Sequence, residues 1–433
     1  MSTPQTPGTS IKPFISCHFF LFLFLLLICN NCFSQTQPKM SMTKLDMVFD
    51  MANKGDANAM FAIANMYIKG EGVAKDTAEG IKWLEKAAKA GHTAAMNNLA
   101  ALSRKNKNAG LDSTQTFLWY LSAAKLGNST AMLNLGMHYM TGKLVQKDSI
   151  EGLKWITKSA ENNNDKAMFT LAGMYDNGKG VDKDSVQALY WYKKSADAGN
   201  AQAQNSLGIK YLKGRWVKRN YETALKLFKK SAGGGDGFAM YNIGFMYEFG
   251  KGISQDYATA LKWYSRSAEK KNNFATYRIG LLYEYGKGIQ QDYTEAMKWY
   301  KMILGKNDGY IMYHIGRLYE EGKGVPKNNN EATLWYQQSA DADNGFGMYG
   351  LGNLHESANE QTQAQLWYHM AIPWFEKEIK KSLDNTEAMM GLAAMYENGK
   401  GIEKNIQKAL QYYKQASELG DEDAKKKVKE LEK

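Results

Sequence analysis

The sequence predicts an all-α protein, an α/α superhelical solenoid of about ten 36-residue helix-turn-helix repeats. The first observation is a tyrosine that recurs every 36 residues, at Tyr139, Tyr175, Tyr211, Tyr247, Tyr283 and Tyr319, with Tyr67 two periods earlier. The second is a tryptophan sixteen residues after the tyrosine position, at Trp83, Trp119, Trp155, Trp191, Trp263, Trp299 and Trp335. Two aromatic positions in phase indicate one supersecondary unit copied end to end.

Residues 239–270 illustrate one repeat. Ala239, Ile243 and Tyr247 recur at helical spacing and predict the apolar face of a first helix. The glycines in the turn at 250–252 end that helix, because glycine accepts the left-handed conformation found at helix ends. Asp256 follows at a position suited to capping the next helix. The second helix then has the apolar face Ala260, Leu261, Trp263, Tyr264 and Ala268.

The first 34 residues have the layout of a secretory signal peptide. Lys12 is their one basic residue, the segment Phe19–Ile28 is an unbroken apolar run, and small residues follow. We expect cleavage after Ser34, which makes the protein exported and leaves no stable membrane span. An uncleaved anchor and lipid attachment at Cys29 or Cys32 are the alternatives.

Composition narrows the chemistry of the mature chain. All three cysteines lie in the predicted signal, so the mature chain has neither disulfides nor thiolate zinc sites. Removal of Lys12 takes the net charge from +11 to +10. Such a modest excess suits anionic envelope polymers, but it is often only a matter of solubility.

Both ends and the ninth unit depart from the repeat. Residues 35–58 are expected to be a short linker and an N-terminal capping helix, residues 59–420 the solenoid, and residues 421–433 a charged capping helix. In the ninth unit His355 replaces the tyrosine and the turn is shortened. Its second helix is expected to run through Pro373 to about Leu383, with a bend at the proline.

The repeated residues resemble a known family. Read as A-x3-[LI]-G-x2-Y-x2-G-x-G-[VI]-x2-D-x3-A-L-x-W-Y-x3-A, the pattern is similar to the Sel-one-like repeat (SLR), a relative of the tetratricopeptide repeat. Clear copies lie at 59–88, 131–160, 167–196, 203–232, 239–268, from 275 onward and at 311–340, and weaker ones at 95–124, 347–371 and 388–416. The resemblance implies a non-catalytic adaptor.

The sequence contains no convincing catalytic or metal-binding motif. The Ser-x-x-Lys matches at Ser41, Ser122 and Ser267 lack the partner motifs of penicillin-binding enzymes. The six histidines have no metal-ligand spacing, so we expect no enzyme, no metal and no cofactor. The recurrent aspartates Asp148, Asp184, Asp256 and Asp292 supply too few ligands for calcium and are interpreted as helix caps.

Lysines recur in the Gly-Lys-Gly turns, at Lys179, Lys251, Lys287, Lys323 and Lys400. They could form a basic edge for an anionic polymer. They could equally be solvated turn residues, since acidic side chains such as Glu248 and Glu284 lie nearby in the sequence.

The most suggestive pattern lies on the first helices. An aromatic residue stands six positions before the recurrent tyrosine at Phe61, Phe169, Tyr241, Tyr277, Tyr313 and Tyr349, and in tetratricopeptide repeats this column faces the concave groove. Phe245 and Arg317 stand two positions before it, Arg278 and His314 are neighbours, and glutamates follow it. We therefore predict a binding groove of Tyr241, Phe245, Tyr277, Arg278, Tyr313, His314, Arg317 and Tyr349. The alternative is that the tyrosines only stack between hairpins.

Two functions follow. The first is an exported scaffold or adaptor that binds a protein or peptide through its concave face. The second is an envelope protein that binds peptidoglycan or another glycan through the lysine edge. Nothing in the sequence favours a nucleic-acid partner.

Overall fold

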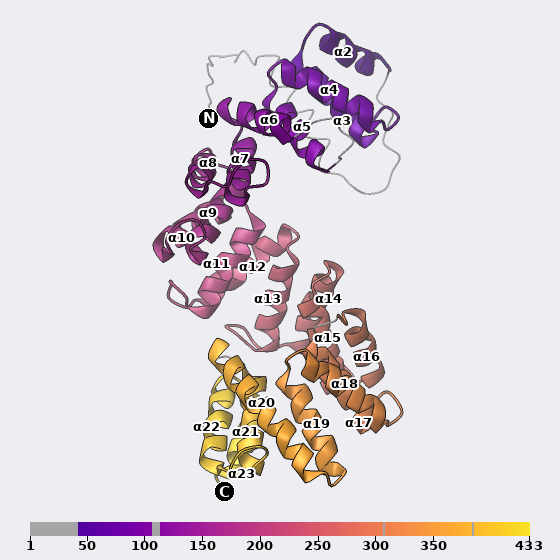
Figure 1. The fold of residues 1–433 in the computed structure, drawn as a ribbon, viewed down its shortest axis with the longest axis vertical. Coiled ribbons are helices and arrows are strands. Elements are labelled where there is room, and N and C mark those ends of the chain that lie inside the picture. Colours follow the sequence, from indigo (N-terminus) through magenta and orange to yellow (C-terminus); the bar gives the residue numbers. More distant parts are fainter. Residues whose placement is uncertain (1–41, 106–112, 306–307, 383–384) are drawn as a thin grey trace, which may run out of the picture. The chain divides into compact units, whose positions relative to one another are not determined.

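The computed structural model describes residues 42–105, 113–305, 308–382 and 385–433, which form 22 α-helices and no β-strand (Figure 1). Consecutive helices pair into hairpins that follow the predicted repeats, so the all-α solenoid is confirmed. The predicted signal at 1–34 and the first part of the expected linker, at 35–41, lie outside the described residues.

The chain forms two compact units, residues 1–126 and residues 127–433. In the first unit the described helices are α2 (Met42–Asn53), α3 (Ala57–Lys69), α4 (Thr77–Lys89), α5 (Thr93–Lys105) and α6 (Ser113–Lys125). Here α3 pairs with α4 and α5 pairs with α6.

The described residues of the second unit form seventeen helices, α7 to α23. Its first helices are α7 (Ser129–Thr141), α9 (Asp165–Asn177), α11 (Ala201–Lys213), α13 (Gly237–Glu248), α15 (Asn273–Tyr285), α17 (Gly309–Glu321), α19 (Gly345–Ser357) and α21 (Thr386–Asn398). Their hairpin partners are α8 (Ser149–Glu161), α10 (Ser185–Asp197), α12 (Tyr221–Gly233), α14 (Tyr257–Glu269), α16 (Tyr293–Met302), α18 (Asn329–Asp341), α20 (Gln361–Lys381) and α22 (Ile406–Glu418). The last helix is α23 (Glu422–Leu431).

The ninth repeat has the long second helix that its sequence predicts. Helix α20 has 21 residues, continues through Pro373 and ends at Lys381. The extra turns begin where the other repeats end their second helix. The bend expected at Pro373 stays a prediction.

The turn between the two helices of a hairpin is fixed by local interactions. In the sixth repeat the backbone N–H of Asp256 donates to the carbonyl oxygen of Tyr247 over 2.9 Å, and the Asp256 carboxylate caps the N–H of Thr259 over 2.9 Å. Gly252 has a φ of +73°, and a Cβ there would come within 2.2 Å of the Tyr221 side chain. The aspartates predicted as caps thus act as caps.

In most hairpins the residue that follows the recurrent tryptophan position is a buried tyrosine. Tyr264 is completely buried, whereas the ring of Trp263 is only half-buried. Tyr264 lies against Gly244, where a Cβ would come within 2.7 Å of its ring. A side chain at Gly244 would crowd this ring, so the glycine lets the two helices of the hairpin pack closely. Tyr300, Tyr336, Tyr368 and Tyr413 are buried in the same way.

Candidate functional site

One side of the first helices α13, α15, α17 and α19 carries many aromatic side chains, and Phe238, Phe274 and Tyr285 among them are exposed. We call it the aromatic face and define it by Phe238, Tyr241, Phe245 and Phe249 of α13 and its end, Phe274, Tyr277, Leu281 and Tyr285 of α15, Tyr310, Tyr313, Arg317 and Glu321 of α17, and Phe346, Tyr349 and Asn353 of α19. These positions share one side of a helix because they are separated by three or four residues.

The predicted groove includes a column of four tyrosines, Tyr241, Tyr277, Tyr313 and Tyr349, which we call the tyrosine ladder. It lies on this face, and its rings are half-buried. Each ladder tyrosine packs against the buried tyrosine of its own hairpin. Ring centroids are 5.6 Å apart for Tyr241 and Tyr264, and 5.7 Å apart for Tyr313 and Tyr336. Tyr277 and Tyr349 pack in the same way, at 6.0 and 5.5 Å. One edge of every ladder ring therefore belongs to the core, and the other remains accessible.

Glu248, one of the glutamates that follow the recurrent tyrosine, lies inside the stack of repeats. Its side chain accepts a hydrogen bond from the Tyr264 hydroxyl over 2.6 Å, and it is only 3% exposed. Arg278 of the next repeat donates to the same carboxylate through Nε, at 3.0 Å, and through Nη2. Arg278 is thereby fixed in orientation by a fork-like pair with a buried acid.

Glu284 repeats this arrangement one hairpin later. Tyr300 donates its hydroxyl to Glu284 over 2.5 Å, and Arg317 also binds the carboxylate. His314 adds a third contact, with Nδ1 3.0 Å from Oε2 of Glu284. The same tyrosine, acid and cation grouping occurs around Asp176, Glu356 and Glu397, with Lys210, Lys400 and Lys427 as cations.

His314 is buried, with 5% of its surface exposed, and it bridges two repeats. Its Nε2 lies 3.0 Å from the Tyr277 hydroxyl. Burial away from water lowers the pKa of His314 to about 4, so the imidazole is neutral at pH 7. A carboxylate only accepts, so we assign the proton to Nδ1, which donates to Glu284, and Nε2 then accepts from Tyr277.

The same burial raises the pKa of Tyr277 and Tyr300 well above the usual value for a phenol. Both side chains are therefore neutral hydrogen-bond donors at pH 7. Phenolate chemistry at these residues is not favoured, and the grouping stabilises the stack of repeats.

The structure adds a column of aromatic residues that the sequence interpretation missed. It stands three residues before the tyrosine ladder, at Phe238, Phe274, Tyr310 and Phe346. Phe238 is 55% exposed, Phe274 is 63% exposed and Tyr285 on the same face is 46% exposed. The 36-residue spacing of this column is visible in the sequence and could have revealed it.

The predicted groove residues thus divide into two groups. Tyr241, Phe245, Tyr277, Tyr313 and Tyr349 are half-buried on the aromatic face, where part of each ring remains accessible. His314, Arg278 and Arg317 are held by Glu248 and Glu284, and among these three only the arginines retain some exposure.

The side chains of three of the five turn lysines contact other groups of the protein. Lys323 pairs with Glu321 at 2.6 Å, and Lys400 pairs with Glu356 at 2.9 Å. Lys251 donates to the carbonyl oxygen of Leu419 over 3.2 Å. These contacts favour the interpretation of the lysines as turn residues over a continuous basic edge.

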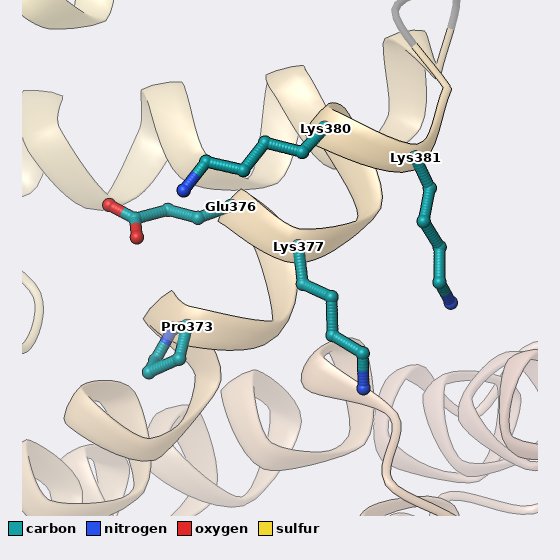
Figure 2. A pocket seen from close by; sticks show the side chains of 5 residues that line it. All are labelled: Pro373, Glu376, Lys377, Lys380 and Lys381. Carbon is teal, nitrogen blue, oxygen red and sulfur yellow. The ribbon is translucent and has the colours of Figure 1, made fainter.

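A separate hollow of about 480 Å³ lies on the extended part of α20 (Figure 2). It is lined by Pro373, Glu376, Lys377, Lys380 and Lys381. Lys377 pairs with Asp343 and Lys381 pairs with Glu378, so two of its three cations are already engaged.

Within the described residues, no three histidine, cysteine or acidic side chains gather as a metal site would require. The helices described here also include none long and apolar enough to cross a membrane.

Comparison with known proteins identifies the family. The Sel1 repeat model matches at 57–92, 93–128, 129–164, 165–200, 201–236, 237–272, 273–303, 311–344 and 386–421. The crystal structure of c5321, a protective antigen present in uropathogenic Escherichia coli strains displaying an SLR fold, is 30% identical with a TM-score of 0.63, and the match covers 89% of this chain and 82% of that one.

A Sel1 repeat protein from Oxalobacter formigenes is also 30% identical, with a TM-score of 0.51, and the match covers 56% of this chain and 99% of that one. Curated proteins gave no match. The nine matched repeats span most of the sequence. The chain therefore belongs to the Sel1 repeat family, whose members are typically non-catalytic scaffolds for protein interactions.

Proposed function

We propose that this protein is an exported adaptor that binds a segment of a protein partner on its aromatic face. The observation that carries the proposal is the exposure of Phe238, Phe274 and Tyr285 on the two neighbouring helices α13 and α15. Aromatic rings provide large contact areas at a small cost in side-chain entropy. Rings fixed by a rigid stack of repeats are well suited to hold an extended or helical segment.

Export is supported by the apolar segment Phe19–Ile28 behind Lys12. Its test is N-terminal sequencing of the protein isolated from its native cells. A mature chain that begins at Gln35 is expected, and a chain that retains the first 34 residues would contradict cleavage. The similarity to c5321, a protective antigen, agrees with an exported protein.

The test of binding uses exposed residues, because substitution of the ladder tyrosines would also disturb the core. In the test variant, Phe238 and Phe274 are replaced by serine. The matched control replaces Leu334 of α18 and Leu366 of α20 by serine; these leucines are 57% and 54% exposed and lie on second helices. Each variant removes two exposed apolar side chains, so both should fold like the wild type.

Each protein, starting at Gln35, is used to capture partners from its native envelope fraction. The captured partner is then purified and its dissociation constant is measured with all three proteins. We expect the test variant to bind the partner at least tenfold more weakly than the wild type. The control variant should bind it with the affinity of the wild type. Equal binding by all three proteins would contradict the aromatic face as the site.

A further inference from the structure

Arg278 has one guanidinium nitrogen that Glu248 does not use. Glu248 takes Nε and Nη2, while Nη1 lies 3.9 Å from Oε1 of Glu387, at the start of α21. The Arg278 side chain is 16% exposed and that of Glu387 is 45% exposed. The arginine is held rigidly on one side, and on the other it meets a carboxylate that is loosely placed.

Glu387 belongs to a segment, from Trp374 on α20 to the start of α21, that contacts the aromatic face at α17 and α19. Trp374 of α20 packs on Tyr310 and Phe346, with ring centroids 5.6 and 5.7 Å apart. Asn385, just before α21, forms a hydrogen bond with Tyr310. The chain thus supplies its own aromatic ring, amide and carboxylate to one part of the face.

The part of the face around Arg278 has further exposed features. The guanidinium carbon lies 5.1 Å from the ring centroid of Phe249, and Tyr285 on α15 is 46% exposed. The ammonium group of Lys287 lies 5.6 Å from the Tyr285 ring centroid and adds positive charge. A carboxylate with an adjacent aromatic side chain would complement this combination of cations and rings.

We propose that Arg278 binds a carboxylate of the partner in the place that Glu387 takes in the free protein, and that Phe249 and Tyr285 hold an aromatic side chain of the same segment. The Glu387 carboxylate stands in for that of the partner. The Arg278–Glu387 contact is long, at 3.9 Å, and the Glu387 side chain is 45% exposed, so the partner displaces Glu387 at small cost. This inference rests on the proposed function, and it specifies the partner as an acidic segment with an aromatic residue.

The experiment selects binders from a displayed library of random short peptides, using the chain from Gln35 onward. We expect the selected peptides to share an Asp or Glu next to an aromatic residue. The tightest peptide is then synthesised, and its dissociation constant is measured with the wild type and with variants.

The informative variant is Glu387→Gln, which removes the internal carboxylate from a half-exposed position and should leave the fold intact. We expect it to bind the peptide about three- to fivefold more tightly, as the loss of a weak competing ion pair predicts. Glu403→Gln, an exposed acid in the same repeat, is the control and should bind like the wild type.

Arg278→Gln should weaken binding at least tenfold, but it also leaves Glu248 buried without its cation. Arg278→Lys retains the charge and loses the fork, and circular dichroism establishes whether each variant is folded. A folded Arg278→Lys variant should lose most of the affinity for the peptide.

The outcomes separate the two proposals. If the wild type selects no peptide, the proposed function is contradicted. If it selects peptides whose affinity is unchanged by Glu387→Gln and by a folded Arg278→Lys variant, adaptor function stands and the carboxylate site is wrong. Peptides that share basic residues in place of acidic ones would likewise overturn the carboxylate site.

Discussion

The hydroxyl of Tyr264 donates a hydrogen bond to Glu248 over 2.6 Å, and both side chains are almost completely buried. Tyr264 belongs to the second helix of its hairpin and Glu248 to the first, and Arg278 reaches the same carboxylate from the next repeat. The grouping therefore joins the two helices of a hairpin and also joins neighbouring hairpins. Its recurrence along the second unit makes it the polar counterpart of the apolar repeat.

Replacement of Tyr264 by phenylalanine should destabilise the second unit by about 2 kcal/mol, because a buried hydrogen bond to a charged group is lost. Thermal and urea unfolding would measure the change. Tyr190→Phe is the control, since Tyr190 is 48% exposed and should lose no stability. Equal stability of the Tyr264 variant and the wild type would mean that the contact with Glu248 contributes nothing.

Replacement of Gly244 by alanine should cost about 1–3 kcal/mol, because the new Cβ would come within 2.7 Å of the Tyr264 ring. Gly173 provides the matched control on another first helix, since a Cβ there meets no atom within 4 Å. Gly173→Ala should stabilise its helix by up to about 1 kcal/mol. Opposite signs in urea unfolding are the expected result, and a similar change in both variants would contradict the packing argument.

The buried His314 should make stability depend on pH. Its pKa is about 4 in the folded protein, below the ordinary value of about 6.5, so protonation favours the unfolded chain. The stability is present above about pH 6.5 and is lost as the pH falls towards 4. Between pH 7 and pH 5 the predicted loss is about 2 kcal/mol.

The variant His314→Gln can still donate and accept hydrogen bonds but does not titrate in this range. Glu284, Tyr277, Tyr300 and Arg317 remain around it. We expect its unfolding free energy to fall less than that of the wild type over the same pH interval. Parallel pH profiles would show that His314 is not the group responsible.

Lys210 and Asp176 form a buried ion pair at 2.8 Å, with side chains 9% and 14% exposed. Lys210→Met should cost about 3 kcal/mol, because it leaves a largely buried carboxylate without its main cation. Lys154→Met removes a pair in which the lysine is 74% exposed, and it should have no measurable effect on unfolding. A similar loss in both variants would contradict the importance of burial.

The sequence by itself determined the repeat, the turn glycines and the helix caps. The Asp256 cap acts on Thr259, and the turn glycines act on their own helix ends, so these features depend on residues close together in the chain. The same turn and cap residues recur every 36 residues, which is why the hairpins could be located from the sequence.

Only the tertiary structure decided which residues of the aromatic face and its neighbours are held by other side chains and which are exposed to solvent. Glu248 meets Tyr264 sixteen residues later and Arg278 thirty residues later, and Glu387 comes from three repeats farther along. The burial of His314 and the exposure of Phe274 likewise depend on how neighbouring hairpins stack. A repeat pattern states that such residues recur. Their burial and their partners depend on how helices that are distant in sequence pack together. The local conformational propensities of the residues do not specify that packing.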